Sequence, residues 1–345
     1  MLKEYPLVSV LVLNYNGLRF LNDCFSSLLE ASYPNQEIIM IDNLSTDDSV
    51  SYMEKHFPTV KIFQNGINGG FSLAYNNAFK IAKGTYFVIL NNDVKVDKAW
   101  LEPMVTLCES DDRIGAVQPK LLSMLEPRKF EYAGASGGHL DKYGYAFTRG
   151  RIFDFVEEDK GQYEDEAEVF WTTGAAMFVR SEALKCSGDM DVDFVHHYEE
   201  IDLCYRINLA GFILKVCPKS IVYHYGGGII SYESYKKMYW NHRNSVFMML
   251  KNLESHNLVW FIPSRILLDA MTLGWAILKF DTRRIRALIH AWFWLLFHPV
   301  LIVQKRKEVK KRRVIRDNEL FKRMYPRSIA IQYFFYHRKI FAALI

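Results

Sequence analysis

Short apolar segments alternate with amphipathic segments over the first 118 residues. The apolar segments at 8–13, 37–41, 60–63, 86–90 and 114–117 are bounded by Asn, Asp, Gly or Pro, which predicts strands. Between them, apolar residues at i, i+3 and i+4 spacing predict helices over about 18–31, 46–57, 71–83 and 98–111. This alternation is typical of an α/β protein whose mainly parallel sheet is covered by helices on both faces.

The periodicity changes after residue 118. From about 120 to 170 Gly and Tyr are frequent, which predicts loops and short hairpins. Strands are predicted over 173–179, 213–216 and 221–224, and a helix over 199–210 that ends at Gly211.

After about residue 245 the chain predicts long helices rich in Trp, Phe, Leu and Ile. The runs 258–280 and 285–303 approach the length of a bilayer span. They contain Pro263, Arg265, Asp269, Arg286, His290 and Pro299. A spanning hairpin would also place positive charge on both sides of the membrane, against the usual bias. We therefore expect helices that lie in, or dip into, the cytoplasmic interface, with a soluble helical subdomain or a dimer face as the alternative.

Charge and cysteine content narrow the class of protein. The net charge of +4 is too mild to indicate nucleic acid, and much of the surplus lies in the stretch 305–313, "KRKEVKKRR", which we expect anionic lipid to hold. Five cysteines form no C-x-x-C pair, so neither a disulfide framework nor a zinc site is indicated. With no secretion leader apparent, we expect a peripheral or monotopic protein on the cytoplasmic face of the cell membrane.

Polar residues gather where the first four predicted strands end. Ligands of parallel sheets bind beyond the carboxyl ends of the strands. The four ends carry Asn14 and Asn16; Asp42 and Asp47; Asn68, Gly69 and Gly70; and Asn91, Asn92 and Asp93. Each group alone is typical of a turn, but four on one edge predict a site.

Individual residues at this edge suggest roles. The Asp42 side chain could stabilise a turn or cap the start of a helix. Alternatively, it could accept hydrogen bonds from a nucleotide base in a pocket that Asn14 and Asn16 also line. The Gly69–Gly70 backbone at a helix start suits phosphate, although no P-loop or dinucleotide fingerprint is present. Asp93 is the one carboxylate at its strand end, and a hard divalent cation on a diphosphate needs one or two.

The segment 194–207 is rich in charge. Glu200 heads an apolar stripe, where desolvation would raise its pKa and suit a general base. Glu199 could simply complement the helix dipole, and Asp202 can pair with Arg206 at i, i+4. His224, before the Gly226–Gly228 run, is either a core imidazole or a metal ligand.

Seven linked motifs carry a resemblance over about residues 5–245. They are "SVLVLNYNG", "IDNLSTDDS", "NGGFSLAYNNA", "ILNNDVKV", "TGAAMFVRSEAL", "HYEEIDLCYRI" and "VYHYGG". Together they resemble family 2 glycosyltransferases, and most of all the bacterial rhamnosyltransferase-like branch. The resemblance implies a GT-A fold with a Rossmann-like sheet, a nucleotide-diphosphate sugar donor, for which dTDP or UDP is expected, a Mg²⁺ or Mn²⁺ ion, and transfer with inversion.

The resemblance also implies roles for single residues. Asn14, Asn16 and Asp42 resemble nucleoside contacts, Asp93 the last residue of the Asp-x-Asp metal motif, Glu200 the catalytic base, and His224 a metal or diphosphate contact. Further substrate contacts are expected at Asp47, Asn68, Gly69, Gly70, Asn77, Asn92, Gly174, Glu199, Asp202 and Arg243. The sequence departs from the family pattern twice, with Asn91 in place of the first Asp of the metal motif and Glu200 where Asp is usual.

These observations predict a GT-A domain over 1–245, with a nucleotide-sugar half over about 1–118 and an acceptor half over about 119–245, followed by a membrane-associated helical region over 246–345. The expected activity is inverting transfer of a sugar, with rhamnose as a candidate, to a saccharide acceptor in cell-surface polysaccharide synthesis. We expect that acceptor to be lipid-linked. One rival is a sugar nucleotidyltransferase, which needs a basic phosphate-binding loop near the first strand, where the sequence supplies only Arg19. The other rival is a non-catalytic polysaccharide- or lipid-binding protein.

Overall fold

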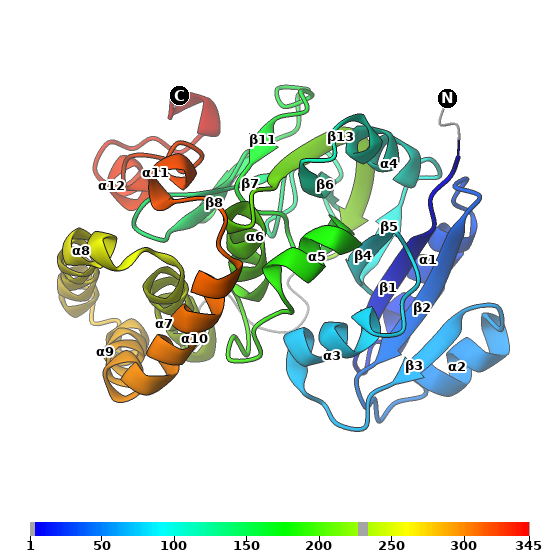
Figure 1. Ribbon diagram of the computed structural model, residues 1–345, viewed down its shortest axis with the longest axis horizontal. Coiled ribbons are helices and arrows are strands. Elements are labelled where there is room, and N and C mark those ends of the chain that lie inside the picture. The colour runs from blue at the N-terminus through cyan, green and yellow to red at the C-terminus, as the bar shows by residue number, and fades with distance from the viewer. Residues whose placement is uncertain (1–3, 227–233, 345) are drawn as a thin grey trace.

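A nine-stranded mixed sheet forms the centre of the molecule (Figure 1). The computed structural model describes residues 4–226 and 234–344. The strand order is β11-β13-β6-β12-β4-β1-β2-β3, and β5 pairs with β13. The strands are β1 (Val8–Asn14), β2 (Gln36–Asp42), β3 (Lys61–Gln64), β4 (Tyr86–Asn91), β5 (Val94–Val96), β6 (Ile114–Ser123), β11 (Glu168–Val169), β12 (Ala176–Arg180) and β13 (Ile213–His224).

Helices cover both faces of the sheet, as the apolar alternation predicts. Leu11 of β1 packs in one core cluster with α3 (Gly70–Phe79), while Val10 and Val12 pack in another with α1 (Leu18–Leu29). Successive strand residues point to opposite faces, so both sides of β1 are buried. The remaining helices of this part are α2 (Ser49–His56), α4 (Leu101–Ser110), α5 (Ser181–Ser187) and α6 (Glu199–Leu209).

The sheet is mixed, whereas the sequence pattern predicts a mainly parallel one. Strands β4, β1, β2 and β3 are parallel, as are β6 and β13. Strand β12 lies antiparallel between β4 and β6, and β5 and β11 pair antiparallel with β13. Hydrophobic pattern does not encode strand direction, and β12 enters the sheet from an irregular segment without a crossover helix. The two strands expected at 213–216 and 221–224 are one strand, β13, with a register shift between Cys217 and Ile221.

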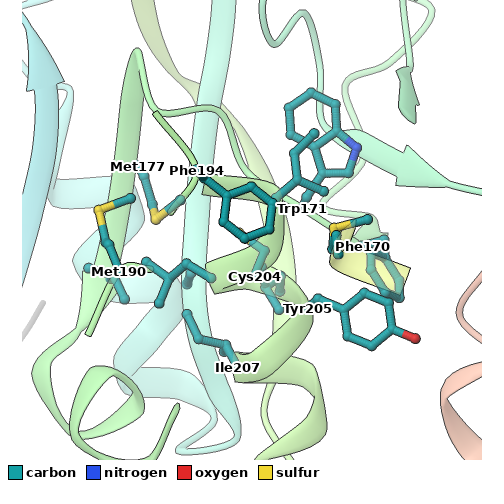
Figure 2. Close-up of a cluster of buried hydrophobic side chains, with 14 of the residues drawn as sticks. Phe170, Trp171, Met177, Met190, Phe194, Cys204, Tyr205 and Ile207 are labelled. Atoms are coloured by element: carbon teal, nitrogen blue, oxygen red, sulfur yellow. The ribbon is translucent and has the colours of Figure 1, made fainter. Parts of the chain in front are cut away.

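The segment 138–156 forms a second, four-stranded antiparallel sheet, in agreement with the predicted hairpins. Its strands are β7 (Gly138–Leu140), β8 (Ala146–Thr148), β9 (Arg151–Ile152) and β10 (Phe155–Val156). Figure 2 shows the core that fixes α6, in which Tyr205, Cys204 and Ile207 lie with Phe170, Trp171 and Phe194. The helix is therefore anchored along its buried side.

The C-terminal third is helical and packs beside the sheet rather than apart from it (Figure 1). Its helices are α7 (Tyr235–Asn252), η1 (Ser255–Asn257), α8 (Leu258–Leu278), α9 (Thr282–Phe297), α10 (Pro299–Arg312), α11 (Asp317–Leu320), α12 (Ile329–Phe334) and η2 (Phe341–Ala343). The single run expected at 285–303 is broken by 73° between α9 and α10, because Pro299 lacks the amide proton that would continue the helix.

The predicted domain boundary near residue 245 falls inside α7. The main core cluster includes Leu295 of α9 and Val309 of α10 as well as Leu11 of the sheet. The helical region and the sheet thus share one hydrophobic core, and the division into two domains stays a prediction.

Candidate functional site

The carboxyl ends of β1 and β2 lie side by side, as the sequence predicts. Asn14 and Asp42 are register partners, and both are buried. The Asn14 side-chain amide donates to Asp42 Oδ1 at 3.3 Å and to Ser45 Oγ at 3.1 Å, while its oxygen accepts from Asn92 at 2.7 Å. A Cβ on Gly17 would lie 2.0 Å from the Asn92 side-chain nitrogen, so glycine is needed for this approach. Amides and a carboxylate from three strand ends therefore meet at one point on the edge of the sheet.

Asn16 and Asp47 shape the loop around that point. Asn16 Oδ1 accepts hydrogen bonds from the amides of Thr46 at 2.7 Å and Asp47 at 3.3 Å. Asp47 in turn accepts from the Leu18 amide at 3.2 Å. Burial opposes ionisation of Asp47, but hydrogen bonds from Ser49 and Leu18 outweigh it and lower the pKa of that carboxyl. Both residues thus hold the loops after β1 and β2 together.

The third strand end positions the start of α3. Asn68 Oδ1 accepts from the Asn43 side chain at 2.8 Å and from the Gly70 amide at 3.3 Å. Gly70 has a φ of +77°, a conformation that favours glycine. Asn77, further along α3, donates to Asn65 Oδ1 at 3.0 Å. Hydrogen bonds between asparagine side chains hold the loop through Gly69 and Gly70. They bring the N-terminus of α3 to the edge of the sheet.

Asp93 and His224 face each other at the end of β4. His224 Nε2 lies 3.0 Å from Asp93 Oδ1 and 3.3 Å from the Asn91 side-chain nitrogen, and its Nδ1 lies 3.2 Å from Glu131 Oε1. Burial disfavours the imidazolium, but the Glu131 and Asp93 carboxylates outweigh it and raise the pKa of His224 to about 10. Burial likewise opposes the Asp93 charge, yet His224 lowers the pKa of Asp93 below its usual range. The two ring nitrogens of His224 thus each lie close to a carboxylate, that of Asp93 and that of Glu131.

The chemistry of this donor set fits a hard divalent cation in part. A carboxylate, Asp93, with a neighbouring imidazole suits Mg²⁺ or Mn²⁺. His224 must lose its proton before Nε2 can bind a metal. Within 4–226 and 234–344 no three His, Cys, Asp or Glu side chains gather as a metal site. Gly227 and Gly228, in the run after His224, lie outside the described residues.

Glu199 and Glu200 open α6 after a strained turn. His197 and Tyr198 have φ values of +63° and +71°, in the left-handed region that side chains other than glycine rarely adopt. Asn244 of α7 donates to the carbonyls of His196 and His197, both at 2.7 Å, which holds this turn. The strain is therefore maintained by α7 and fixes the two glutamates in place.

The two glutamates share a desolvated position. Burial raises the pKa of Glu200 to about 7, although the amides of Glu200 and Ile201 favour its charge. Burial and then the neighbouring Glu200 raise the pKa of Glu199 well above its usual range. Among the described residues Oε2 of each glutamate has no hydrogen-bond partner. The raised pKa of Glu200 agrees with the desolvation that the sequence predicts.

Gly174 joins the two parts of the site. The Asn91 amide at the end of β4 donates to the Ala175 carbonyl at 3.1 Å, so Gly174 and Ala175 run beside the Asp93 turn. A Cβ on Gly174 would lie 2.9 Å from Phe71 Cζ and 3.6 Å from Glu200 Cβ. The segment just before β12 therefore lies beside the end of β4, the start of α3 and Glu200.

Asp202 does not serve as the predicted substrate contact. It is fully buried, and Asp202 Oδ2 pairs with Arg206 and Lys251, each at 2.9 Å, while Oδ1 accepts from Asn252 at 2.8 Å. Both carboxylate oxygens are therefore paired inside the protein. The pair with Arg206 is the i, i+4 pairing that the sequence also allowed.

Arg243 is likewise buried and structural rather than a substrate contact. Its guanidinium lies 4.4 Å from the ring centroids of both Trp240 and Trp294, and it donates to the Asp193 carbonyl. Arg243 thus helps Asn244 to hold the segment before Glu199, and it reaches the site only through that segment.

Glu131 is the site residue that the sequence did not indicate. It lies in a loop between β6 and β7, is buried, and takes part in the His224 pair through Oε1. Its segment has no strand or helix periodicity, and its partner is far away in the chain, so no local pattern could have marked it.

Comparisons with known proteins match this chain to glycosyltransferases. The sequence profile of glycosyl transferase family 2 matches residues 9–185. An uncharacterized glycosyltransferase of Haemophilus influenzae is 34% identical over 128 residues, which are 36% of this chain and 40% of that protein. A putative teichuronic acid biosynthesis glycosyltransferase of Bacillus subtilis, TuaG, is 35% identical over 100 residues, 28% of this chain and 40% of that protein. The matched segments thus span less than half of these relatives.

Solved structures share the fold. GalNAc-T7 with UDP, GalNAc and Mn²⁺ has a TM-score of 0.58 at 18% identity, covering 76% of this chain and 51% of that one. A mannosyltransferase of Pyrobaculum calidifontis with GDP-Man and Mn²⁺ has a TM-score of 0.52 at 14% identity, covering 90% and 86%. The fold is therefore GT-A-like, with a mixed sheet and flanking helices.

Proposed function

The chain belongs to glycosyl transferase family 2, and from this premise we propose that it transfers a sugar, with inversion, from a nucleotide-diphosphate donor to a saccharide in cell-surface polysaccharide synthesis. The observation that carries the proposal is the position of Glu200. This desolvated carboxylate with a pKa near 7 lies across Gly174 from the strand ends that suit a nucleotide. A general base works best when its pKa is close to the working pH.

Different residues of the site would bind the nucleoside, bind the cation and accept the proton. Asn14, Asp42 and their loops hold the nucleoside, and the N-terminus of α3 favours negative charge nearby. A divalent cation, bound by Asp93 and, once deprotonated, His224, would neutralise the diphosphate leaving group. Glu200 accepts the proton of the acceptor hydroxyl as that oxygen bonds to the anomeric carbon and the bond from this carbon to the diphosphate breaks. Attack from the face opposite the diphosphate inverts the configuration.

The ligands in similar solved structures and the name of one relative support a nucleotide-sugar donor and a role in polysaccharide synthesis. The solved structures with a similar fold bind UDP or GDP-Man together with Mn²⁺, and one relative is named for teichuronic acid biosynthesis. We keep a dTDP- or UDP-sugar as the proposed donor and rhamnose as the candidate sugar, both from the motif resemblance.

The C-terminal helices support membrane association and a lipid-linked acceptor. Within α8 the charged residues Arg265 and Asp269 are buried and pair with each other at 3.2 Å. Several large apolar side chains of α8, α9 and the turn between them are exposed, namely Val259, Leu267, Trp275, Leu278, Phe280, Phe293, Leu296 and Phe297. We name this set the apolar face. A soluble protein rarely exposes so many large apolar side chains on two neighbouring helices.

The basic stretch contributes less to this association than the sequence suggested. Lys305 pairs with Asp191 and Asp193, and Arg313 pairs with Asp317, so these charges stabilise the fold. Lys307, Lys310 and Lys311 are exposed and are the ones available to anionic lipid. By length and composition Ser255–Leu278 could cross a bilayer, but its buried Arg265–Asp269 pair favours a helix that lies on the cytoplasmic face.

Binding of UDP-, GDP- and dTDP-sugars, with and without Mn²⁺, tests the proposal against its rivals. A glycosyltransferase binds one donor in a metal-dependent way and releases the nucleoside diphosphate when an acceptor is present. A sugar nucleotidyltransferase would release pyrophosphate from a nucleoside triphosphate and a sugar phosphate, and a non-catalytic binding protein would release neither.

A further inference from the structure

Glu131 is a buried carboxylate that the proposed mechanism does not use. It lies in the loop between β6 and β7 with 4% of its surface exposed. Its Oε1 lies 3.2 Å from His224 Nδ1, and its Oε2 accepts a hydrogen bond from the Ala133 backbone amide at 2.6 Å. The backbone amide of Glu131 also donates to the Leu121 carbonyl on β6 at 3.0 Å. The loop therefore holds this carboxylate in one orientation against the imidazole.

Asp93 and Glu131 lie next to different nitrogens of the His224 ring. Nε2 is 3.0 Å from Asp93 Oδ1, whereas Nδ1 is the nitrogen next to Glu131. Gly226 passes close to Glu131, since an added Cβ there would lie 2.8 Å from Oε1. The three side chains do not converge on one point, because no group of three His, Cys, Asp or Glu among the described residues could hold a metal ion. A cation bound by Asp93 would therefore meet Nε2, with Glu131 at the other nitrogen.

We propose that Glu131 is a positioning residue that keeps Nε2 of His224 directed towards the cation. This inference rests on the proposed function, to which it adds a residue that the motifs do not mark. A neutral imidazole that binds a cation through Nε2 carries its proton on Nδ1. Histidine ligands almost always donate that proton to a carboxylate, a carbonyl or water, which fixes the tautomer and the orientation of the ring. Glu131 is the carboxylate beside Nδ1.

The contact between Nδ1 and Glu131 is close but not aligned. Nδ1 makes no aligned hydrogen bond with the described residues, although Glu131 Oε1 is 3.2 Å away. Buried polar atoms are rarely left without a partner, and hydrogen bonds of active sites are often loose until the ligands bind. A small turn of the ring would align the pair, so we expect the contact to tighten when the cation binds.

The Glu131→Gln substitution separates this role from a packing role. The Ala133 amide donates to Oε2, so the oxygen of a glutamine amide would take that place and its NH₂ group would face His224 Nδ1. An NH₂ group only donates, so Nδ1 would become an acceptor and the ring proton would move to Nε2, the nitrogen that must bind the cation. Glutamine has nearly the size of glutamate, yet it should weaken cation binding as much as alanine does.

Mn²⁺ binding to the full chain tests the proposal by calorimetric titration. The chain is first saturated with whichever of UDP, GDP and dTDP the wild-type protein binds, and the nucleotide solution without protein is the blank. We expect Glu131→Gln and Glu131→Ala each to weaken Mn²⁺ binding by about ten- to a hundredfold, the usual effect of losing such a partner. Nucleotide affinity at saturating Mn²⁺ should change by less than about twofold. Glu126→Gln, at an exposed position of the same loop, should change neither.

Other results overturn the inference. Wild-type Mn²⁺ affinity in a folded Glu131→Gln protein would show that Glu131 does not direct the ring. Weakening by alanine but not by glutamine would reduce Glu131 to a packing role. Failure of the proposed function would look different, because the wild-type chain itself would then bind no nucleotide or no Mn²⁺.

Thermal midpoints check that the variants fold. If Glu131→Gln does not fold, nitrogen-15 NMR of the His224 ring in the wild-type chain, with Mg²⁺ and the nucleotide bound, decides the question. A proton on Nδ1 supports the inference, and a proton on Nε2 overturns it.

Discussion

At the scale of single residues, the site depends on how burial changes the charge of a few carboxylates. Glu200 and Asp93 are both partly removed from water, but only Asp93 has a cation, His224, beside it. Burial therefore keeps Glu200 near half-ionised at neutral pH and His224 keeps Asp93 ionised. One carboxylate is ready to exchange a proton and the other to hold a positive charge.

The pH dependence of transfer follows from Glu200. A base must be ionised to accept a proton, and Glu200 ionises as pH rises through its pKa of about 7. We expect kcat/KM for the acceptor to rise about tenfold per pH unit below 7 and to level off above it. Initial rates at saturating donor between pH 5.5 and 8.5 measure this. A profile that is flat from pH 5.5 upward would show that Glu200 is not the base.

The sequence predicted those site residues whose setting is local. Asn14, Asp42 and Asp93 follow strands that the hydrophobic pattern locates, so their common edge could be inferred. Glu131 could not be, because a tertiary contact alone brings it to His224. Asp202 and Arg243 were assigned to substrate from motif position, but the packing of α7 onto α6 uses their charges inside the protein.

At the scale of elements, the position of α6 depends on a buried ion network. Lys251 of α7 pairs with Asp202 of α6 at 2.9 Å and with Asp191 at 2.6 Å, and Lys305 of α10 reaches the same Asp191 at 2.7 Å. Three helices and the loop before α6 are therefore joined at one point. The C-terminal helices thereby contribute to the geometry of Glu199 and Glu200.

Removal of the central cation of this network should destabilise the fold. Lys251→Met leaves Asp191 and Asp202 buried with fewer partners, which we expect to cost about 3 kcal/mol in the free energy of unfolding. Lys307→Met, on the exposed side of α10, should cost less than about 0.5 kcal/mol. Urea unfolding followed by circular dichroism measures both. Equal stability of the two variants would contradict a structural role for the network.

The elements themselves were predictable to different degrees. The strand and helix alternation of 8–117 follows from local periodicity, and each predicted strand there overlaps an observed one. The insertion of β12 between β4 and β6 is set by long-range pairing, which single-sequence patterns do not contain. The break between α9 and α10 was marked by Pro299, but the apolar run continued across it.

At the scale of the whole molecule, the apolar face lies on two helices that pack on each other. Helix α9 packs along α7, and α8 packs on α9. Figure 1 shows α8 and α9 on the side away from β1, β2 and β3. A protein that rests on lipid through α8 and α9 would therefore keep its nucleotide edge in solution.

The apolar face should determine binding to vesicles. The variant Leu267→Ser, Leu278→Ser, Phe297→Ser removes side chains that are 63%, 78% and 76% exposed, so folding should be little affected. We expect its partition onto anionic vesicles to fall at least about tenfold, because apolar burial in lipid drives the association. Leu125→Ser, which is 65% exposed elsewhere, is the matched control. Equal co-sedimentation of both variants would favour a soluble or dimeric role for these helices.

The central claim is that this chain transfers sugar with Glu200 as the base. Transfer of radiolabelled sugar from UDP-, GDP- or dTDP-linked donors to a lipid extract, with Mn²⁺ present, tests it most directly. We predict that the wild-type chain labels the lipid fraction from one donor and that Glu200→Gln lowers this rate by about 10²- to 10⁴-fold while donor binding is retained. Glu182→Gln, at an exposed position of α5, should label normally. No labelling by the wild-type chain from any donor that it binds, or near-normal labelling by Glu200→Gln, would contradict the account.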